Sequence, residues 1–248
     1  MKAKNLYSPG KIHLYDGKII PTDVLMVNET KLAVYLNQSY ITTLSASPGA
    51  ERELAVGYLL SEGIIGVNSQ LVSLEYSPGQ VYLITCEPSP EVNGTEGVAL
   101  NPRKTPHSID PEGKVVFQAE HLLNLIRKLE QQSHAFKLTG GVHSAALADN
   151  NDIMIQHEDI GRHNAVDKVV GHAYLQNIPL RDKCLVLSGR VTHEIISKVV
   201  SNGIPLLLSR SAPTLESVQW AERMGISVVG FARGRRFNIY CHPQRIVI

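Results

Sequence analysis

Short apolar segments alternate with amphipathic segments through the second half of the chain, and this alternation limits the folds that the chain can adopt. Residues 153–156, 184–187, 205–208 and 226–231 have the apolar character of strands, and 142–148 pairs with the first of them across a polar turn. The pattern predicts an α/β layered domain with a largely parallel sheet. Helices are expected at 118–131, around 166–173, at 191–201 and from about residue 213.

The first half of the chain has the pattern of a smaller, mixed α+β domain. Hairpins are predicted over 31–45 and 71–86, around polar turns. Between them, Ser47 as N-cap and Pro48 at the first helical position predict a helix that Gly63 ends.

A segment rich in proline and glycine, 87–113, separates the two halves. Such a segment breaks regular structure and marks a linker or a functional loop. We therefore expect an N-terminal domain over residues 1–113, with this loop at its end, and a C-terminal domain over residues 114–248.

Composition excludes several classes of protein. Hydrophobic residues make up 43% of the chain and charged residues 19%, as in a globular protein with a substantial core. The formal net charge of +1 argues against a protein that binds nucleic acid over its whole surface. The amino terminus has no signal-peptide pattern, and no stretch is long and apolar enough to cross a membrane. The expected location is the cytoplasm.

The cysteines do not form the pattern of a disulfide framework or a structural zinc site. Cys86, Cys184 and Cys241 are far apart and odd in number. Cys184 begins an apolar strand and Cys86 ends one, so both are predicted to be buried, unreactive thiols.

The segment HEDIGRHNAVDK, residues 157–168, carries the densest group of polar side chains. Apolar residues at helical spacing follow it, so the segment is predicted to be a loop that enters a helix. Imidazole and guanidinium groups at a helix N-terminus suit a binding site. A pair between His163 and Asp167, spaced i and i+4 on that helix, is the simpler structural interpretation.

Polar residues also follow the predicted strands, and in an open α/β sheet ligands bind at the carboxyl ends of the strands. The loops there should bring together Arg162, Arg190, Arg210 and Arg233, next to helix N-termini. Such a site suits an anion, in particular a phosphate or pyrophosphate ester. The basic pair at 235–236 fits either this site or a solvated tip.

Structural interpretations compete with functional ones for other polar residues. His143 follows a glycine pair and fits a structural strand histidine as well as a ligand-binding one. His193 is expected to be exposed on a helix, and Glu194 and Lys198, at i and i+4, to form a surface pair.

Metal and nucleophile signatures are weak. His157 and His163 fit no common zinc spacing. Ser188 lies in LSGR and not in a GxSxG nucleophile elbow. No metal site and no catalytic serine are predicted.

A series of motifs in a fixed order distinguishes the chain as a whole. They are ELAVGYLLSEGII within 48–65, TGGVH (139–143), EDIGRHNAVDK (158–168), SGR (188–190), GIP (203–205), SRSAPT (209–214) and GFARGRRFNIY (230–240). Together they resemble the FdhD family, over most of the chain from about residue 20 to the end.

This resemblance implies a formate dehydrogenase accessory protein. Family members carry sulfur from a cysteine desulfurase to the bis(molybdopterin guanine dinucleotide) molybdenum cofactor before its insertion into formate dehydrogenase, and they form homodimers. They bind this cofactor, which GDP mimics. Their C-terminal domain is similar to cytidine deaminases, a three-layer α/β/α fold, without the deaminase zinc site.

The family's cofactor-binding stretch maps onto residues 231–236 of this chain. Together with the polar residues at the strand ends, it gives a set of expected cofactor-binding residues. They are His143, Asp159, Arg162, His163, Asn164, Ser188, Gly189, Arg190, Ser209, Phe231, Ala232, Arg233, Gly234, Arg235 and Arg236.

One family motif is absent from this chain. The family has CGxCG between its domains, and the first cysteine carries the persulfide. Here residues 105–111 read TPHSIDP, and no cysteine occurs between Cys86 and Cys184. A persulfide requires a thiol, so no catalytic residue is expected for sulfur transfer except Cys86 as a substitute.

Two other functions stay open. An enzyme acting on a nucleotide or phosphate ester would use His163 or His157 as general base, oriented by Asp159 or Asp167. A recruitment scaffold would bind formate dehydrogenase or the desulfurase without holding the cofactor, and the strand-end arginines would then be dispensable.

Overall fold

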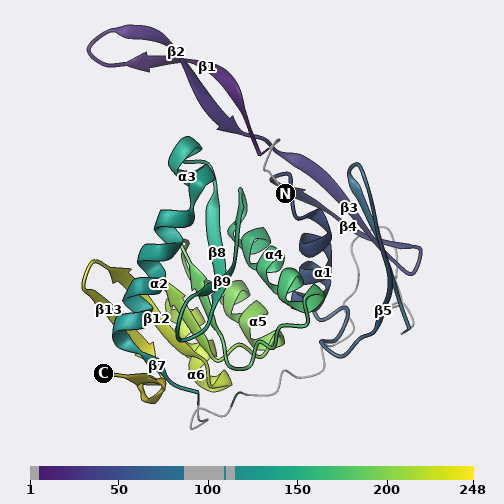
Figure 1. The fold of residues 1–248 in the computed structure, drawn as a ribbon, viewed down its shortest axis with the longest axis vertical. Helices are drawn as coiled ribbons and strands as arrows, with labels where there is room; N and C mark the ends of the chain where they lie inside the picture. The colour runs from purple at the N-terminus through teal and green to yellow at the C-terminus, as the bar shows by residue number, and fades with distance from the viewer. Residues whose placement is uncertain (1–5, 87–108, 110–114) are drawn as a thin grey trace.

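The computed structural model describes residues 6–86, 109 and 115–248, and a six-stranded sheet forms the centre of its C-terminal half (Figure 1). The strands are β8 (His143–Ala148), β9 (Ile153–Asp159), β10 (Cys184–Leu187), β11 (Leu206–Ser209), β12 (Ser227–Arg233) and β13 (Arg236–Cys241). Their order in the sheet is β13-β12-β11-β10-β8-β9. The predicted loop 87–113 lies almost entirely outside the described residues.

Parallel strands occupy only the centre of this sheet. β10 pairs with β11 and β11 with β12 in parallel, whereas β8 is antiparallel to both β9 and β10, and β13 is antiparallel to β12. The prediction of a largely parallel sheet is therefore wrong at both margins. Short turns join β8 to β9 and β12 to β13, and a short turn permits only antiparallel pairing.

Helices cover both faces of the sheet. α2 (Ala119–Gln132) packs on one face through its buried leucines. α4 (Arg162–Leu175), α5 (His193–Ser201) and α6 (Leu215–Met224) cover the opposite face and share a second apolar cluster. The prediction of a mixed α/β chain is confirmed, with the layers ordered α/β/α in this half (Figure 1). No helix of the described residues is long and apolar enough to span a membrane.

The N-terminal half contains a four-stranded sheet and a helix packed against it. The elements are β3 (Thr30–Leu36), β4 (Ser39–Ala46), α1 (Glu51–Ser61), β5 (Leu71–Ser77) and β6 (Gln80–Thr85). The strand order is β4-β3-β6-β5, so both predicted hairpins are confirmed.

The start of α1 differs from the prediction. The helix begins at Glu51, not after Ser47, and no side chain caps it. Ser47 has another use: its amide donates to Asp159 Oδ2 at 3.1 Å, and its hydroxyl accepts from the Ile160 amide at 3.0 Å. A residue with the sequence signature of a cap therefore connects the two halves of the chain instead.

One apolar cluster crosses the predicted domain boundary. It contains Val34 of β3 and Leu54 and Leu59 of α1, together with Val166 and Val169 of α4, all fully buried. The division at residue 113 stays a prediction, but the two halves are held together by a common core.

A two-stranded hairpin, β1 (Tyr7–Tyr15) and β2 (Ile19–Val27), projects away from the rest of the chain (Figure 1). No element is predicted before residue 31, because the apolar residues there have no buried face to give them a clear pattern. Leu14, Tyr15 and Ile19 are exposed near its turn. The remaining elements are β7 (Phe117–Gln118), α3 (His134–Thr139), the 3-10 helix η1 (Pro243–Arg245) and β14 (Ile246–Val247).

Candidate functional site

The predicted strand-end loops meet at one edge of the main sheet. β9, β10, β11 and β12 end at this edge, and β8 begins there because it runs antiparallel to its neighbours. His143, the first residue of β8, therefore lies among the loops. We call this region the sheet edge. It consists of His143, Arg162 and residues 188–190, 209–211 and 231–236.

Hydrogen bonds connect the loops of the sheet edge. The Ser144 amide donates to Ser188 Oγ at 2.9 Å, and the Ser209 hydroxyl donates to the Gly189 carbonyl at 2.7 Å. The Phe231 amide donates to the Ser211 carbonyl at 3.0 Å. The loops are thus parts of one connected surface.

Gly189 lies where the loop after β10 passes between β8 and α4. A Cβ atom here would lie 3.3 Å from His143 Nδ1 and 3.5 Å from Arg162 Cβ. Burial, and then the charges of Arg162 and Arg190, lower the pKa of His143. The imidazole is therefore neutral at pH 7 and has one donor and one acceptor nitrogen.

The arginines of the sheet edge carry positive charge that the described carboxylates leave largely unneutralised. Arg210 forms an ion pair with Glu130. The buried Nε of Arg162 has no hydrogen-bond partner within the described part of the chain. Arg162, Arg190 and Arg233 form no salt bridge with any described carboxylate. An electropositive surface of this kind suits an anion.

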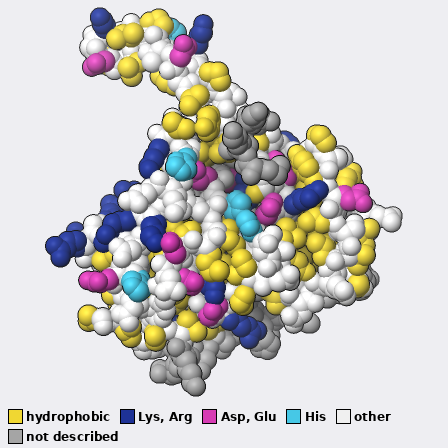
Figure 2. All heavy atoms as spheres, viewed as in Figure 1, with side chains coloured by type: hydrophobic (Ala, Val, Ile, Leu, Met, Phe, Trp, Pro, Cys, Tyr) yellow, Lys and Arg dark blue, Asp and Glu magenta, His cyan; other side chains and the backbone are white. Residues whose placement is uncertain are grey.

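The turn between β12 and β13 adds further basic side chains. Phe231 has a φ of 54°, a left-handed conformation that is strained for an aromatic residue. The Arg233 guanidinium lies 5.0 Å from the centroid of the Phe231 ring. Arg235 and Arg236 are exposed, and Lys and Arg side chains gather over this part of the molecule in Figure 2. Gly234, with a φ of 59°, allows the turn.

Four of the predicted cofactor-binding residues are buried: Asp159, Gly189, Ser209 and Ala232. Asp159 is 0% exposed and accepts hydrogen bonds from the Ser47 amide and from Asn164 Nδ2, at 3.1 and 3.0 Å. Its carboxylate also lies 2.7 Å from Lys168 Nζ. Ala232 is likewise 0% exposed. The Asp159 side chain therefore anchors the motif to the N-terminal half and leaves no accessible surface for a ligand.

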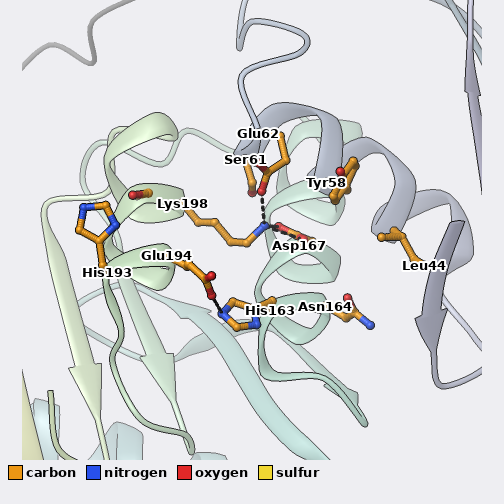
Figure 3. Close-up of a pocket in the computed structure, with 11 residues that line it drawn as sticks. Leu44, Tyr58, Ser61, Glu62, His163, Asn164, Asp167, His193, Glu194 and Lys198 are labelled. Atoms are coloured by element: carbon orange, nitrogen blue, oxygen red, sulfur yellow. Dashed lines mark hydrogen bonds and ion pairs between the residues drawn. The ribbon is translucent and has the colours of Figure 1, made fainter. Parts of the chain in front are cut away.

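A cavity of 530 Å³ lies between α1, α4 and α5 (Figure 3). Lys198 points into it from α5, and its Nζ lies 2.9 Å from Asp167 Oδ2 and 3.3 Å from Glu62 Oε1. Burial opposes the charge of Lys198, but the two carboxylates outweigh burial and raise its pKa. The predicted surface pair of Lys198 and Glu194 is therefore wrong. Lys198 is only 5% exposed, because the facing helices offer it buried partners.

His163 and Glu194 form a second polar pair of this cavity. His163 Nε2 lies 2.9 Å from Glu194 Oε2, across the gap between α4 and α5 (Figure 3). The predicted pair of His163 with Asp167 is not formed, since each of them binds a residue of α5. Burial, and then the charge of Arg162, lower the pKa of His163, so the ring is neutral at pH 7, and its Nε2 makes no hydrogen bond of good geometry despite the short distance. His193 lines the same cavity and is half-buried, not exposed as predicted.

His157 has a structural partner. Its Nε2 lies 2.9 Å from His172 Nδ1. Burial, and then the charges of His172 and Lys168, lower the pKa of His157 to about 4. The ring is neutral and bound to His172, so the geometry does not favour His157 as a general base. The predicted pairing of His163 with Asp159 is also not formed.

Thiol and metal-binding groups are sparse in the described residues. Cys184 and Cys241 are buried, and burial raises the pKa of both thiols, that of Cys241 to about 11. Cys86 is exposed, so the prediction that it is buried is wrong. It continues the outward alternation of Tyr82 and Ile84 along β6. Among the described residues, no three His, Cys, Asp or Glu side chains are placed to hold a metal ion.

The motifs that build the sheet edge and the cavity match a known family. The sequence profile of the FdhD/NarQ family matches residues 27–247. This chain belongs to the FdhD/NarQ family. It is similar to the sulfur carrier protein FdhD of Bacillus licheniformis, 34% identical with 98% of each chain covered, and to that of Bacillus pumilus, 36% identical with 95% of each chain covered.

A solved crystal structure has the same fold. It is the crystal structure of a protein from Desulfotalea psychrophila that is described as a formate dehydrogenase accessory protein. The TM-score is 0.84 and the identity 26%, with 98% of this chain and 100% of that chain covered.

One wall of the cavity in this FdhD/NarQ family member is not predicted from the sequence. Tyr58, Ser61 and Glu62 line it from α1. All of them lie in the family motif ELAVGYLLSEGII, where they are polar residues within its mainly apolar stretch from residue 54 to 65. Polar residues on the packed side of a helix are the signal that would have indicated this wall.

Proposed function

We propose that this protein is a formate dehydrogenase accessory protein that binds the bis(molybdopterin guanine dinucleotide) molybdenum cofactor at the sheet edge. Membership of the FdhD/NarQ family supports the general role, as do the relatives named sulfur carrier proteins and the solved structure described as a formate dehydrogenase accessory protein. Binding of the cofactor is the more specific part of the proposal and depends on the sheet edge.

The observation that carries the proposal is the unpaired Nε of Arg162. This nitrogen is buried and has no hydrogen-bond partner within the described part of the chain. A buried donor without an acceptor is costly, so a ligand oxygen is the expected partner. Arg190 and Arg233 add charge at the same edge. A hydrogen bond from a guanidinium to a phosphate oxygen contributes about 1.5–3 kcal/mol.

The residues of the sheet edge fit the pyrophosphate groups of this cofactor. Arg162, Arg190 and Arg233 would hold the phosphates, together with the amides at the start of α4. Neutral His143 would donate a hydrogen bond without adding charge. When bound, the cofactor supplies the molybdenum centre on which the dehydrogenase depends. The residues described here bind and orient its nucleotide arms.

Sulfur delivery is a separate part of the family role, and the chain offers one thiol for it. Cys86 is exposed, whereas Cys184 and Cys241 are buried with raised pKa values. The thiolate is the form that attacks a persulfide, so a buried thiol with a raised pKa is a poor acceptor. We therefore assign any sulfur received from a cysteine desulfurase to Cys86.

Complementation tests the proposed function. The chain is expressed in cells that lack their own family member, and formate dehydrogenase activity is measured. We expect the wild-type chain to restore formate dehydrogenase activity. The activity restored by the double variant Arg190→Gln/Arg233→Gln should be at least about 10-fold lower, because two charged contacts are lost. The control is Arg181→Gln, an exposed arginine just before the amino end of β10.

The outcomes separate three functions. Absence of rescue by a soluble wild-type chain would contradict the accessory role. Full rescue by the double arginine variant would indicate a recruitment scaffold that does not hold the cofactor. Full rescue by Cys86→Ser would show that this thiol carries no sulfur, while leaving cofactor binding in place.

A further inference from the structure

We infer that an exposed groove along α2 is the docking site for an acidic segment of a protein partner, which it holds next to the sheet edge. The groove has a volume of 310 Å³, and it is lined by His121, Asn124, Arg127, Lys128 and Gln131 of α2 and by Asn151 of the turn between β8 and β9. None of these residues belongs to the sheet edge. Only the identity of the partner, the dehydrogenase that receives the cofactor, rests on the proposed function.

Helix α2 is amphipathic, and the groove follows its outward side. His121, Asn124, Lys128 and Gln131 recur at the spacing of one helical face, and Arg127 lies beside them. The apolar residues of the opposite side are buried against the main sheet. The polar side chains of the groove are therefore carried by a helix that its buried face holds in place.

Every side chain that lines the groove has a hydrogen-bond donor, and none is a carboxylate. Arg127 forms no ion pair with a carboxylate of the described residues. Lys128 Nζ lies 2.7 Å from Asp152 Oδ1, which positions the ammonium group and leaves it further N–H donors. This excess of donors and positive charge is complementary to a segment rich in carboxylates.

The carboxylates nearest in sequence do not fill the groove. Glu120 and Glu130 of α2 lie outside its lining, and Glu130 forms an ion pair with Arg210 of the sheet edge. The carboxylate of Asp149, in the turn between β8 and β9, accepts hydrogen bonds from two backbone amides of its own turn, at 2.7 and 2.9 Å. The carboxylates that would neutralise Arg127 therefore have to come from another molecule.

The length of the groove favours a peptide over a small anion. Residues 121 to 131 span about 15 Å of helix, which equals the length of about five residues of extended chain. A single phosphate ion contacts only a few of the donors and leaves the rest of the groove unoccupied. A segment with several consecutive Asp or Glu residues supplies carboxylates along its whole length.

The groove leads to the sheet edge. Ser133, directly after α2, has its Oγ 2.7 Å from Ser144 Oγ near the start of β8, so the carboxyl end of α2 lies at this edge. The ion pair of Glu130 with Arg210 joins the same end of the helix to the loop after β11. Figure 2 shows Lys and Arg side chains gathered over α2 and beside it. A protein held by the groove therefore lies next to any ligand of the sheet edge.

Fluorescence anisotropy with a labelled hexaglutamate peptide tests the groove. At low ionic strength, Arg127→Gln/Lys128→Gln should bind the peptide at least about 5-fold more weakly than the wild-type chain, because two charged contacts are lost. The matched control Lys11→Gln/Lys18→Gln removes the same charge from exposed positions of the β1–β2 hairpin, and its affinity should stay within about 2-fold of the wild type. The sheet-edge variant Arg190→Gln/Arg233→Gln should also retain the affinity for the peptide.

Several results of this titration would overturn the inference. One is the absence of peptide binding by the wild-type chain, and another is equal weakening in the groove variant and in Lys11→Gln/Lys18→Gln, which would show an effect of net charge alone. Loss of binding only in the sheet-edge variant would place the peptide at the sheet edge. Displacement of the peptide by an equal concentration of inorganic phosphate would assign the groove to a small anion. Tighter binding of a labelled oligothymidylate, with the same dependence on Arg127, would assign it to nucleic acid.

Complementation tests the identity of the partner. Arg127→Gln/Lys128→Gln should restore at least about 3-fold less formate dehydrogenase activity than the wild-type chain, with GDP affinity unchanged, because docking is weakened and the sheet edge is intact. Full rescue by this variant would overturn the groove as the docking site of the dehydrogenase. If the wild-type chain does not restore activity, the proposed function fails, and the peptide titration then decides the role of the groove by itself.

Discussion

The backbones of Gly57 in α1 and Gly171 in α4 are in direct contact, and this contact joins the N-terminal half to the main sheet. A Cβ atom on Gly57 would lie 1.8 Å from the Asp167 carbonyl oxygen, and one on Gly171 would lie 1.9 Å from the Glu53 carbonyl oxygen. The two helices therefore need glycine at their crossing. Since α1 and α4 form two walls of the cavity, this crossing also determines its shape.

Gly171→Ala should lower the free energy of unfolding by about 2–3 kcal/mol, because the added methyl group forces two packed helices apart. Urea unfolding measures the change. Gly66→Ala is the control, since its nearest neighbour would be 3.6 Å away and no strain is expected. Equal stability of the Gly171→Ala chain and the wild type would show that the helices can separate freely.

Lys198→Met should lower the free energy of unfolding by about 3–5 kcal/mol, because Asp167 is then left buried without its counter-charge. The double variant Lys198→Met/Asp167→Leu should recover much of the loss. The matched control is Lys128→Met, which breaks the exposed pair with Asp152 and should cost less than about 1 kcal/mol. Similar losses of stability in Lys198→Met and Lys128→Met would mean that burial does not make the pair of Lys198 and Asp167 more costly to break.

His157 should make the protein less stable as pH falls from 6.5 to 4. Its pKa is lowered from 6.5 to about 4 by burial, so between these values the unfolded chain binds a proton that the folded chain does not. The loss should reach about 2–3 kcal/mol at pH 4. Urea unfolding across this range should show a shallower pH dependence for His157→Gln, and an unaltered one for His121→Gln, which changes an exposed histidine. Parallel curves for wild type and His157→Gln would contradict the assignment.

Cys86 should react with a thiol reagent in the native protein, whereas Cys184 and Cys241 should react only after unfolding. The difference follows from exposure and from the raised pKa of the buried thiols. The absorbance of released thionitrobenzoate reports both phases. Cys86→Ser should remove the native phase alone, and a native phase that persists in this variant would show that a buried thiol is accessible.

Much of the sheet edge could be predicted from sequence because its physical basis is local. Apolar runs mark the strands, and ligands bind where strands of an open α/β sheet end, so the sequence predicts that Arg162, Arg190, Arg210 and Arg233 lie at one edge. The strand-end loops meet at one edge of the sheet although both of its margins are antiparallel. Strand β8 places His143 at the same edge by running the other way.

The cavity could not be predicted because its contacts are long-range. Lys198 and Glu194 have the i and i+4 spacing of a surface pair, and the spacing contains no information about a facing helix. Lys198 binds Asp167 of α4 and Glu62 at the end of α1. The same is true of Ser47. Its sequence context is that of a helix cap, but its amide donates a hydrogen bond to Asp159 in the other half of the chain. Local patterns identify strands and loops, whereas the partners of buried polar groups depend on the packing of distant elements.

The most direct test of the account is calorimetric titration of GDP into the wild-type chain and into Arg162→Gln. Arg162→Gln should bind GDP at least about 10-fold more weakly than the wild type, because one charged hydrogen bond to phosphate is lost, and the control Arg181→Gln should bind it equally well. Equal GDP affinity in all three proteins would contradict the claim that the sheet edge holds the phosphates of the ligand.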